Sequence, residues 1–180
     1  EQLNQLISDI LNYTLTDQNG FEIDRKATHI EDIVITLKKL YKSTADLKNI
    51  TLAFNIVNIN KAVRIDPEKF KQIFGNLLSN AIKFTPQSGQ IKSTISLDST
   101  SNTLTLTVKD NGIGMSKETI QKIISGNNPD TREGTGGEKG TGLGTTIIYK
   151  FTKLHNGNLN INSLPRHGTT FTVNIPLSSS

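Results

Sequence analysis

A helix face made of amides and a lysine is the first feature of this chain that could do chemistry. Gln72, Asn76, Asn80 and Lys83 recur at helical spacing within residues 67–84, on the side away from the apolar residues of that segment. Amide oxygens can ligate a hard cation such as Mg²⁺, and a lysine one turn on can contact a phosphate. Taken alone, this stripe also fits an ordinary solvated helix face.

An aspartate followed by spaced glycines is the second such feature. Asp110 ends a predicted strand and opens the segment Asp-Asn-Gly-Ile-Gly-Met at residues 110–115. Its carboxylate can accept a hydrogen bond from an exocyclic amine, while Gly112 and Gly114 let a flat ring approach the backbone. A simple turn is the alternative, because Asn-Gly is a frequent turn pair.

The third feature is a glycine-dense stretch, since residues 126–144 hold seven of the 14 glycines. The part from 134 to 144 leads into a predicted helix, and free amides at a helix N-terminus beside a glycine loop form an anion cradle. The stretch contains neither a Walker A loop nor a dinucleotide fingerprint. A flexible linker is the alternative, although long irregular loops inside compact domains tend to be functional.

The elements that must position these segments follow from hydrophobic periodicity and capping residues. Asp66 and Pro67 predict the start of the helix 67–84, Ser116 predicts the cap of a short helix over 116–125, and Thr28 with Glu31 fits a capping box. Further helices are predicted over 1–16 and from about Thr141 to Gly157, and strands over 21–23, 51–57, 61–65, 90–98, 103–109, 158–163 and 169–175. This order predicts an α+β fold, a two-layer sandwich with helices packed on one face of a mixed, mostly antiparallel sheet.

Composition narrows the class of protein. The chain of 180 residues is long enough for one domain with a short appendage. It has no cysteine, which excludes a disulfide scaffold and a thiolate zinc site. The net charge of +4 is not concentrated in runs, so we expect no nucleic-acid partner. No apolar stretch is long enough for a membrane span. Because the chain begins with Glu1 rather than Met, we expect a piece of a longer protein.

The three features in this order resemble the ATP-binding domain of sensor histidine kinases, in the Bergerat-type superfamily shared with gyrase, mismatch-repair and heat-shock ATPases. Residues 76–86, Asn-Leu-Leu-Ser-Asn-Ala-Ile-Lys-Phe-Thr-Pro, resemble the N box of that family. Residues 110–115 resemble its first glycine box and residues 140–144 its second. The resemblance covers about residues 50–177 and includes Gly157 and the ending at residues 168–171.

The resemblance implies ATP and Mg²⁺ as cofactors and a role for each matched residue. Asn80, with Asn76, would hold the Mg²⁺ that bridges the phosphates, and Lys83 would contact phosphate. Asp110 would accept from the adenine amino group, supported by Thr169, and residues 126–141 would form an ATP lid. Implied nucleotide contacts are Asn76, Asn80, Lys83, Phe84, Asp110, Gly112, Ile113, Gly114, Arg132, Lys139, Gly140, Thr141, Gly142, Leu143, Gly144 and Thr169.

The resemblance also implies a domain plan and partners. Residues 1–18 would be the C-terminal end of a dimerisation and phosphoacceptor hairpin helix, 19–49 a linking strand and helix, 50–177 the catalytic domain and 178–180 a tail. The γ-phosphoryl group of ATP would pass to a histidine outside this chain, on the hairpin domain of the same protein, and then to a response regulator receiver domain. We expect a homodimeric parent, a cytoplasmic location for this domain and no direct membrane contact by it; a membrane anchor elsewhere in the parent is compatible with this expectation.

Several departures keep alternatives open. Hydrolytic members of the superfamily carry a water-activating glutamate where this chain has Asn76, and an amide is a poor general base, which disfavours a clamp-type ATPase. The phenylalanine-rich box before the lid is missing, and Thr145 replaces a leucine. The missing box leaves a degenerate nucleotide-binding module without transfer activity as the alternative. His29, His155 and His167 lack a metal-binding spacing, and we expect structural roles for them.

Overall fold

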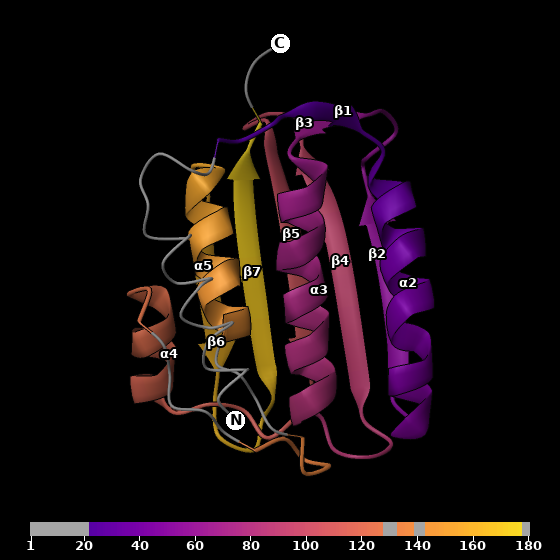
Figure 1. Ribbon diagram of the computed structural model, residues 1–180, viewed down its shortest axis with the longest axis vertical. Helices are drawn as coiled ribbons and strands as arrows, with labels where there is room; N and C mark the ends of the chain where they lie inside the picture. Colours follow the sequence, from indigo (N-terminus) through magenta and orange to yellow (C-terminus); the bar gives the residue numbers. More distant parts are fainter. Residues whose placement is uncertain (1–21, 128–132, 139–142, 178–180) are drawn as a thin grey trace.

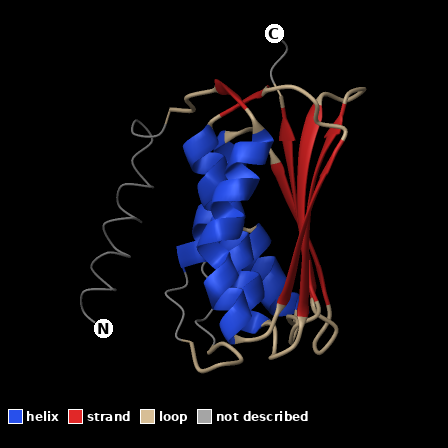
Figure 2. Cartoon of the chain, turned by 90° about the vertical axis from the view of Figure 1, so that its right-hand side faces the viewer, coloured by secondary structure: helices blue, strands red, loops and turns tan. Residues whose placement is uncertain are grey.

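One five-stranded sheet carries helices on a single face in the computed structural model, which describes residues 22–127, 133–138 and 143–177 (Figure 1 and Figure 2). The strands are β2 (Thr51–Val57), β4 (Gln90–Asp98), β5 (Thr103–Asp110), β6 (Asn158–Ser163) and β7 (Thr169–Pro176). Their order across the sheet is β2-β4-β5-β7-β6. The β2–β4 pair is parallel and the other pairs are antiparallel, so the predicted fold class is confirmed.

The helix layer consists of α2 (Ile30–Leu47), α3 (Pro67–Phe84), α4 (Lys117–Ile124) and α5 (Leu143–Leu154). Figure 1 shows α3 between α2 and α5, over the middle of the sheet. The α3 helix begins where the sequence predicts, because Asp66 accepts a hydrogen bond from the Lys69 backbone amide and Pro67 occupies the first turn. Its buried face centres on Phe70, Phe74 and Leu77, each 0% exposed.

The sheet supplies the other half of the core, because every second residue of a strand points toward the helices. In β5, Leu104, Leu106 and Val108 point toward the helices and are at most 1% exposed. In β7 the matching row is Phe171, Val173 and Ile175. Because the two strands pair along their whole length, these rows form one continuous apolar surface beneath α3 and α5.

A separate two-stranded ribbon crosses one end of the sandwich (Figure 1). It consists of β1 (Lys26–Thr28) and β3 (Val63–Ile65), paired antiparallel. Arg25 fastens this ribbon to the end of α5, since its guanidinium donates to the carbonyl oxygen of His155 at 3.2 Å. None of the described helices is both long enough and apolar enough to cross a membrane.

Two local predictions near this ribbon are wrong. The strand predicted over 21–23 is absent at Glu22 and Ile23, and β1 begins later because its partner is β3. The capping box of Thr28 and Glu31 does not form either. Thr28 lies in β1, and its hydroxyl donates to the Lys26 carbonyl at 3.0 Å. Because Thr28 is part of a paired strand, it does not cap α2. The predicted helix over 1–16 and the tail 178–180 lie outside the described residues.

Candidate functional site

The inward rows of three neighbouring strands change from apolar to polar at the same end of the sheet. In β5 the row Leu104, Leu106, Val108 continues to Asp110, which is 7% exposed. The strand register places Asp110 opposite Thr169 of β7, and Thr169 opposite Ser163 of β6. The three side chains therefore form a buried polar floor at the edge of the core.

The carboxylate of Asp110 is held by two backbone amides. Its Oδ1 atom accepts from the amides of Gly112 at 2.8 Å and Thr169 at 3.1 Å. Among the described residues both hydrogen bonds go to Oδ1, so Oδ2 keeps its acceptor capacity for a ligand. Burial raises the pKa of Asp110 above its ordinary value, and the two amide hydrogen bonds oppose this rise. The site thus presents an oriented and largely buried acceptor.

Gly112 and Gly114 lie where the backbone approaches other backbone atoms so closely that a side chain would not fit. A Cβ on Gly112 would collide with the carbonyl oxygen of Phe84, the last residue of α3. Gly114 has a φ of +68°, and a Cβ there would collide with the Leu164 carbonyl oxygen. The amide of Ile113 also donates to the Phe84 carbonyl at 3.1 Å. The Asp-x-Gly-x-Gly segment is therefore joined directly to the C-terminal end of α3.

The amide face of α3 points at the start of α5. A Cβ built on Gly144 would lie 3.0 Å from Asn76 Oδ1 and 3.6 Å from Asn80 Oδ1. The Asn76 side-chain nitrogen donates to the Gln72 carbonyl at 2.8 Å, which turns its oxygen away from its own helix. Two amide oxygens one turn apart therefore face the first turn of α5.

Part of the predicted lid also meets the end of α3. The Thr135 amide donates to the Lys83 carbonyl at 3.0 Å, and the Thr135 hydroxyl donates to the Thr85 carbonyl at 2.7 Å. The Lys83 ammonium lies over the Phe84 ring, 4.9 Å from its centroid. Hence the amide face, the aspartate turn and the glycine-dense segment all converge on the C-terminal half of α3.

Most predicted site residues fall within this cluster. Asn76, Asn80, Lys83, Phe84, Asp110, Gly112, Ile113, Gly114, Gly144 and Thr169 line it or support it. Leu143 begins α5 and is buried at 6% exposed. Arg132, Lys139, Gly140, Thr141 and Gly142 lie outside the described residues. The ligand contacts of all these residues stay predictions.

Ser163 is a supporting residue that motif reading missed. Its hydroxyl accepts from the Met115 amide at 2.9 Å, donates to the Gly168 carbonyl at 2.8 Å and lies 2.9 Å from Thr169 Oγ1. Thr169 therefore supports Asp110 through its backbone amide, while its hydroxyl pairs with Ser163. The signal in the sequence is the polar residue that ends the inward row of β6, which alternation alone can find.

The donor set suits a hard divalent cation better than a soft one. Asn76 Oδ1 and Asn80 Oδ1 are neutral oxygen ligands on one side of a shared space, which is the chemistry that Mg²⁺ accepts when phosphate oxygens complete its shell. The described residues contain no group of three or more His, Cys, Asp and Glu side chains that could hold a metal alone. The residues present therefore fit a metal that arrives with a phosphate ligand.

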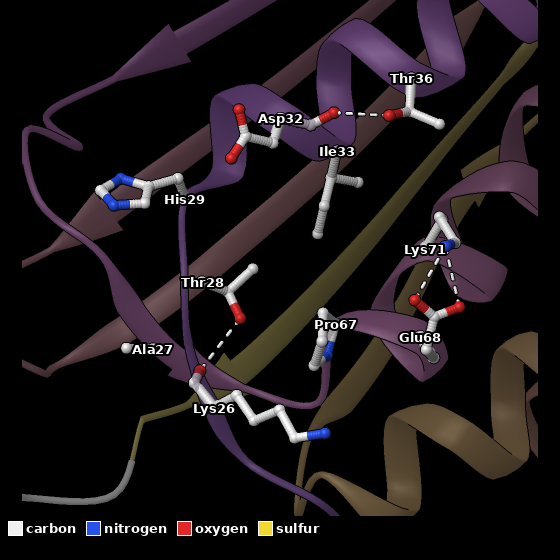
Figure 3. Close-up of a pocket in the computed structure, with 10 residues that line it drawn as sticks. All are labelled: Lys26, Ala27, Thr28, His29, Asp32, Ile33, Thr36, Pro67, Glu68 and Lys71. Carbon is white, nitrogen blue, oxygen red and sulfur yellow. Dashed lines mark hydrogen bonds and ion pairs between the residues drawn. The ribbon is translucent and has the colours of Figure 1, made fainter.

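A groove lies at the N-terminal end of α3, between β1, α2 and α3, with a volume of about 320 Å³ (Figure 3). Two of its lysines are in ion pairs, since Lys71 lies 2.8 Å from Glu68 and Lys26 lies 2.6 Å from Asp24. The Thr36 hydroxyl donates to the backbone carbonyl of Asp32 at 2.8 Å, and the Asp32 carboxylate forms no ion pair with a described residue. His29 at its rim caps α2 without a side-chain hydrogen bond. This groove brings together no unpaired cluster comparable with the one around Asp110.

The family described as "Histidine kinase-, DNA gyrase B-, and HSP90-like ATPase" matches residues 65–179. The chain belongs to this family. Among curated histidine kinase relatives, WalK of Bacillus subtilis is 26% identical over 176 residues, covering 98% of this chain and 29% of WalK. Sensor protein EvgS of Escherichia coli K12 is 33% identical over 184 residues, covering 100% of this chain and 15% of EvgS.

Solved histidine kinase structures share the fold. The nucleotide-free catalytic domain of ThkA has a TM-score of 0.71 at 25% identity, covering 86% of this chain and 96% of that domain. Full-length ShkA, solved in complex with AMPPNP, has a TM-score of 0.80 at 22% identity, covering 99% of this chain and 36% of ShkA. The chain spans 18% of TmoS, the kinase of Ectopseudomonas mendocina, 29% of WalK and 15% of EvgS, so it matches a minor part of these relatives.

Proposed function

We propose that this chain is the catalytic, ATP-binding domain of a sensor histidine kinase, which transfers the γ-phosphoryl group of ATP to a histidine on a phosphoacceptor hairpin. The observation that carries the proposal is the convergence of Asp110, the two asparagines and the first turn of α5 on one half of α3. Family membership and the histidine kinase relatives support the same conclusion.

The base end of the site recognises adenine. Asp110 Oδ2 accepts from the exocyclic amine, while the amides on Oδ1 hold the carboxylate in place. Gly112 and Gly114 let this segment pack against the backbone of Phe84 and Leu164, which sets the position of Asp110 beside the adenine. Because the acceptor is buried, a base without a donor at that position would leave it unpaired, which gives selectivity for adenine over guanine.

The phosphate end of the site positions the reacting group. Asn76 and Asn80 would hold Mg²⁺, which neutralises phosphate charge when bound. Lys83 adds a positive charge one turn on, and backbone amides at the start of α5 face the phosphate tail. In transfer, a lone pair on the acceptor imidazole forms the phosphorus–nitrogen bond. The bond from the γ-phosphorus to the bridging oxygen breaks, its electrons leave with ADP, and the imidazole loses the proton on its other nitrogen.

The residue at position 76 favours transfer to a side chain over hydrolysis. Its nitrogen is engaged with the Gln72 carbonyl and its oxygen faces Gly144, so the side chain offers no group that could take a proton from water. A site that does not activate water preserves the phosphoryl group until an acceptor histidine arrives.

The proposed function also implies the partners of the kinase. The acceptor would be the hairpin domain of the same protein, and the phosphoryl group would pass on to a response regulator receiver domain. ThkA has been solved in complex with the response regulator protein TrrA, which supports this type of partner. We further propose a homodimeric parent, with this domain in the cytoplasm and outside the membrane.

Two measurements test the proposal. Titration with a fluorescent ATP analogue and Mg²⁺ should show saturable binding. Labelled ATP should then transfer phosphate slowly to an acceptor hairpin supplied as a separate chain, because the benefit of tethering is lost. Binding without any transfer would instead indicate a degenerate nucleotide-binding module, and steady phosphate release without the hairpin would indicate a hydrolytic ATPase.

A further inference from the structure

The ammonium group of Lys48 lies where two helices and a loop meet. It donates to the carbonyl oxygens of Ile82 at 2.8 Å and Lys83 at 3.2 Å, at the end of α3. On its other side it donates to Thr135 Oγ1 at 2.7 Å and pairs with Glu138 Oε1 at 3.0 Å. The Lys48 side chain is 16% exposed and the Glu138 side chain 38%, so these interactions are partly shielded from water. Shielded, charge-assisted hydrogen bonds are stronger than those of an exposed ion pair.

The position of Lys48 is itself fixed by the fold. Lys48 caps the C-terminal end of α2, where its amide donates to the Ala45 carbonyl at 3.1 Å. Its own carbonyl accepts from the Ser88 amide at 2.8 Å. Because α2 and α3 both end beside the ammonium group, the negative ends of two helix dipoles favour a cation there.

Glu138 organises the segment 133–138 around the same contact. Its Oε2 atom accepts from the Gly136 amide at 2.8 Å, and its carbonyl accepts from the Gly134 amide at 2.9 Å. Burial tends to raise the pKa of Glu138, but hydrogen bonds from its own amide, Lys48 and Gly136 outweigh burial and lower it. The carboxylate therefore stays charged while it folds the segment into a tight turn and pairs with Lys48.

The docked turn touches a residue of the proposed nucleotide site. A Cβ on Gly134 would lie 2.6 Å from Lys83 Cγ, so the backbone of the turn packs directly against the stem of the Lys83 side chain. The Thr135 amide is bonded to the Lys83 carbonyl at 3.0 Å. With the turn in place, fewer Lys83 rotamers are open, because one side of the stem is occupied.

We propose that Lys48 is a positioning residue for nucleotide binding. By anchoring the turn 133–138 to the end of α3 through Glu138 and Thr135, it holds the Lys83 side chain in the orientation that meets phosphate. Lys48 itself does not contact the nucleotide. The effect of Lys48 on ATP binding rests on the proposed nucleotide site. The anchoring of the turn by Lys48 can be observed without nucleotide.

The test uses the whole 180-residue chain in four variants. Lys48→Met removes the charge and keeps most of the stem, Glu138→Gln keeps the shape and removes the charge, and a third variant combines both changes. Lys42→Met is the matched control, because Lys42 lies on the same helix and pairs with Asp46 at 2.8 Å, with the two side chains 67% and 57% exposed. Amide hydrogen exchange of residues 134–136 is measured without nucleotide, and the Kd of Mg²⁺-ATP and the KM and kcat of transfer are measured separately.

We expect Lys48→Met and Glu138→Gln each to speed exchange of residues 134–136 and to raise the Kd and KM for ATP about three- to tenfold, with kcat at saturating ATP changed less than about twofold. The double variant should be no worse than Lys48→Met, because the two side chains act as one unit. Lys42→Met should match the parent in every measurement. Unchanged exchange, an unchanged or tighter Kd, or additive effects would overturn the inference. A parent chain that binds no nucleotide would refute the proposed function, while the exchange measurement would still report whether Lys48 anchors the turn.

Discussion

At its N-terminal end, α3 borders a groove whose ion pair is local in sequence, whereas its C-terminal half receives polar groups from segments far apart in the chain. In the groove, Glu68 pairs with Lys71 three residues away (Figure 3). At the other end, Ile113 bonds to the Phe84 carbonyl and Thr135 bonds to the Lys83 carbonyl, across about 30 and 50 residues of sequence. The groove is lined by residues of β1, α2 and α3, but its Glu68–Lys71 ion pair is local in sequence, whereas the polar contacts at the C-terminal half of α3 join distant segments.

This comparison distinguishes a groove that is merely lined by polar residues from a cluster of polar groups that is able to bind a ligand. Glu68 and Lys71 in the groove already pair with each other, so a ligand that binds either of them would have to replace an existing interaction. In the part of the chain that the structure describes, Asp110 Oδ2 and the oxygen of Asn80 have no protein partner, although Asp110 is 7% exposed. The Asn80 side chain is only partly buried, and neither oxygen is a fully buried, unpaired atom, so a ligand that donates to them would displace water rather than a protein partner.

The largest effect should follow Asn80→Ala. The change removes one of the two amide oxygens proposed to hold Mg²⁺, so the phosphates lose charge neutralisation in the transition state. We expect transfer to the acceptor hairpin to fall by about 100-fold or more, measured with labelled ATP. Ser79→Ala is the control, because Ser79 is exposed on the same helix turn. Equal transfer rates for Asn80→Ala and Ser79→Ala would show that the Asn80 amide has no special role in transfer. The contrast between the two ends of α3 would then no longer hold.

The next effect should follow Asp110→Asn. The amide keeps an oxygen for the Gly112 and Thr169 amides but turns a donor toward the adenine amine, so we expect the Kd for ATP to rise about 10- to 100-fold. Folding should not suffer, because burial raises the pKa of Asp110 and its ionised form therefore costs stability.

The raised pKa of Asp110 also predicts the direction in which the stability of the protein changes with pH. The folded protein holds the Asp110 proton more tightly than the unfolded chain, so stability due to this group falls as pH rises from about 3.9 through the raised folded pKa. Asp110→Asn should thus be at least as stable as the parent at neutral pH and lose this advantage in acid. Urea unfolding at several pH values measures it. A clear loss of stability at pH 7 would show that the charge supports the fold.

The sequence predicts the ends of α3 and the three motifs because their signals are local. Asp66 and Pro67 begin the helix, and the chain leaves it just before Thr85 and Pro86, all within a few residues of the element they bound. Thr28 shows where local reasoning fails, because pairing of β1 with β3 depends on Val63, far along the chain. Strand pairing outcompetes a capping box whose residues are otherwise suitable.

Ser163 and Lys48 could not be predicted for a related reason. Ser163 matters because the register sets it opposite Thr169, and register is a property of the sheet rather than of β6. Lys48 meets Glu138 across 90 positions of sequence. Motifs therefore identify the groups proposed to touch the ligand, while the residues that hold those groups in place emerge only from the tertiary structure.

A smaller effect should follow Ser163→Ala. The loss of the hydroxyl leaves the Met115 amide and the Gly168 carbonyl without their partner in a buried setting, which should cost about 1–3 kcal/mol of unfolding free energy. The Kd for ATP should rise only a few-fold, because Asp110 keeps both of its amides. Ser125→Ala, at an exposed helix end, is the comparison. A Kd change as large as that of Asp110→Asn would mean that Ser163 contacts the nucleotide itself.

The smallest effect on nucleotide should follow changes at the N-terminal end of α3. Asp66→Ala removes the N-cap that accepts from Lys69, which should cost about 0.5–2 kcal/mol of unfolding free energy, while the Kd for ATP stays within about twofold of the parent. Burial tends to raise the pKa of Asp66, but its hydrogen bonds with Lys69 and Asp24 lower it overall, so its stabilising contribution is present above the ordinary pKa and disappears as pH falls through the lowered one. Lys71→Met in the groove should change neither quantity. If either variant weakened ATP binding as much as Asn80→Ala does, the two ends of α3 would share one function.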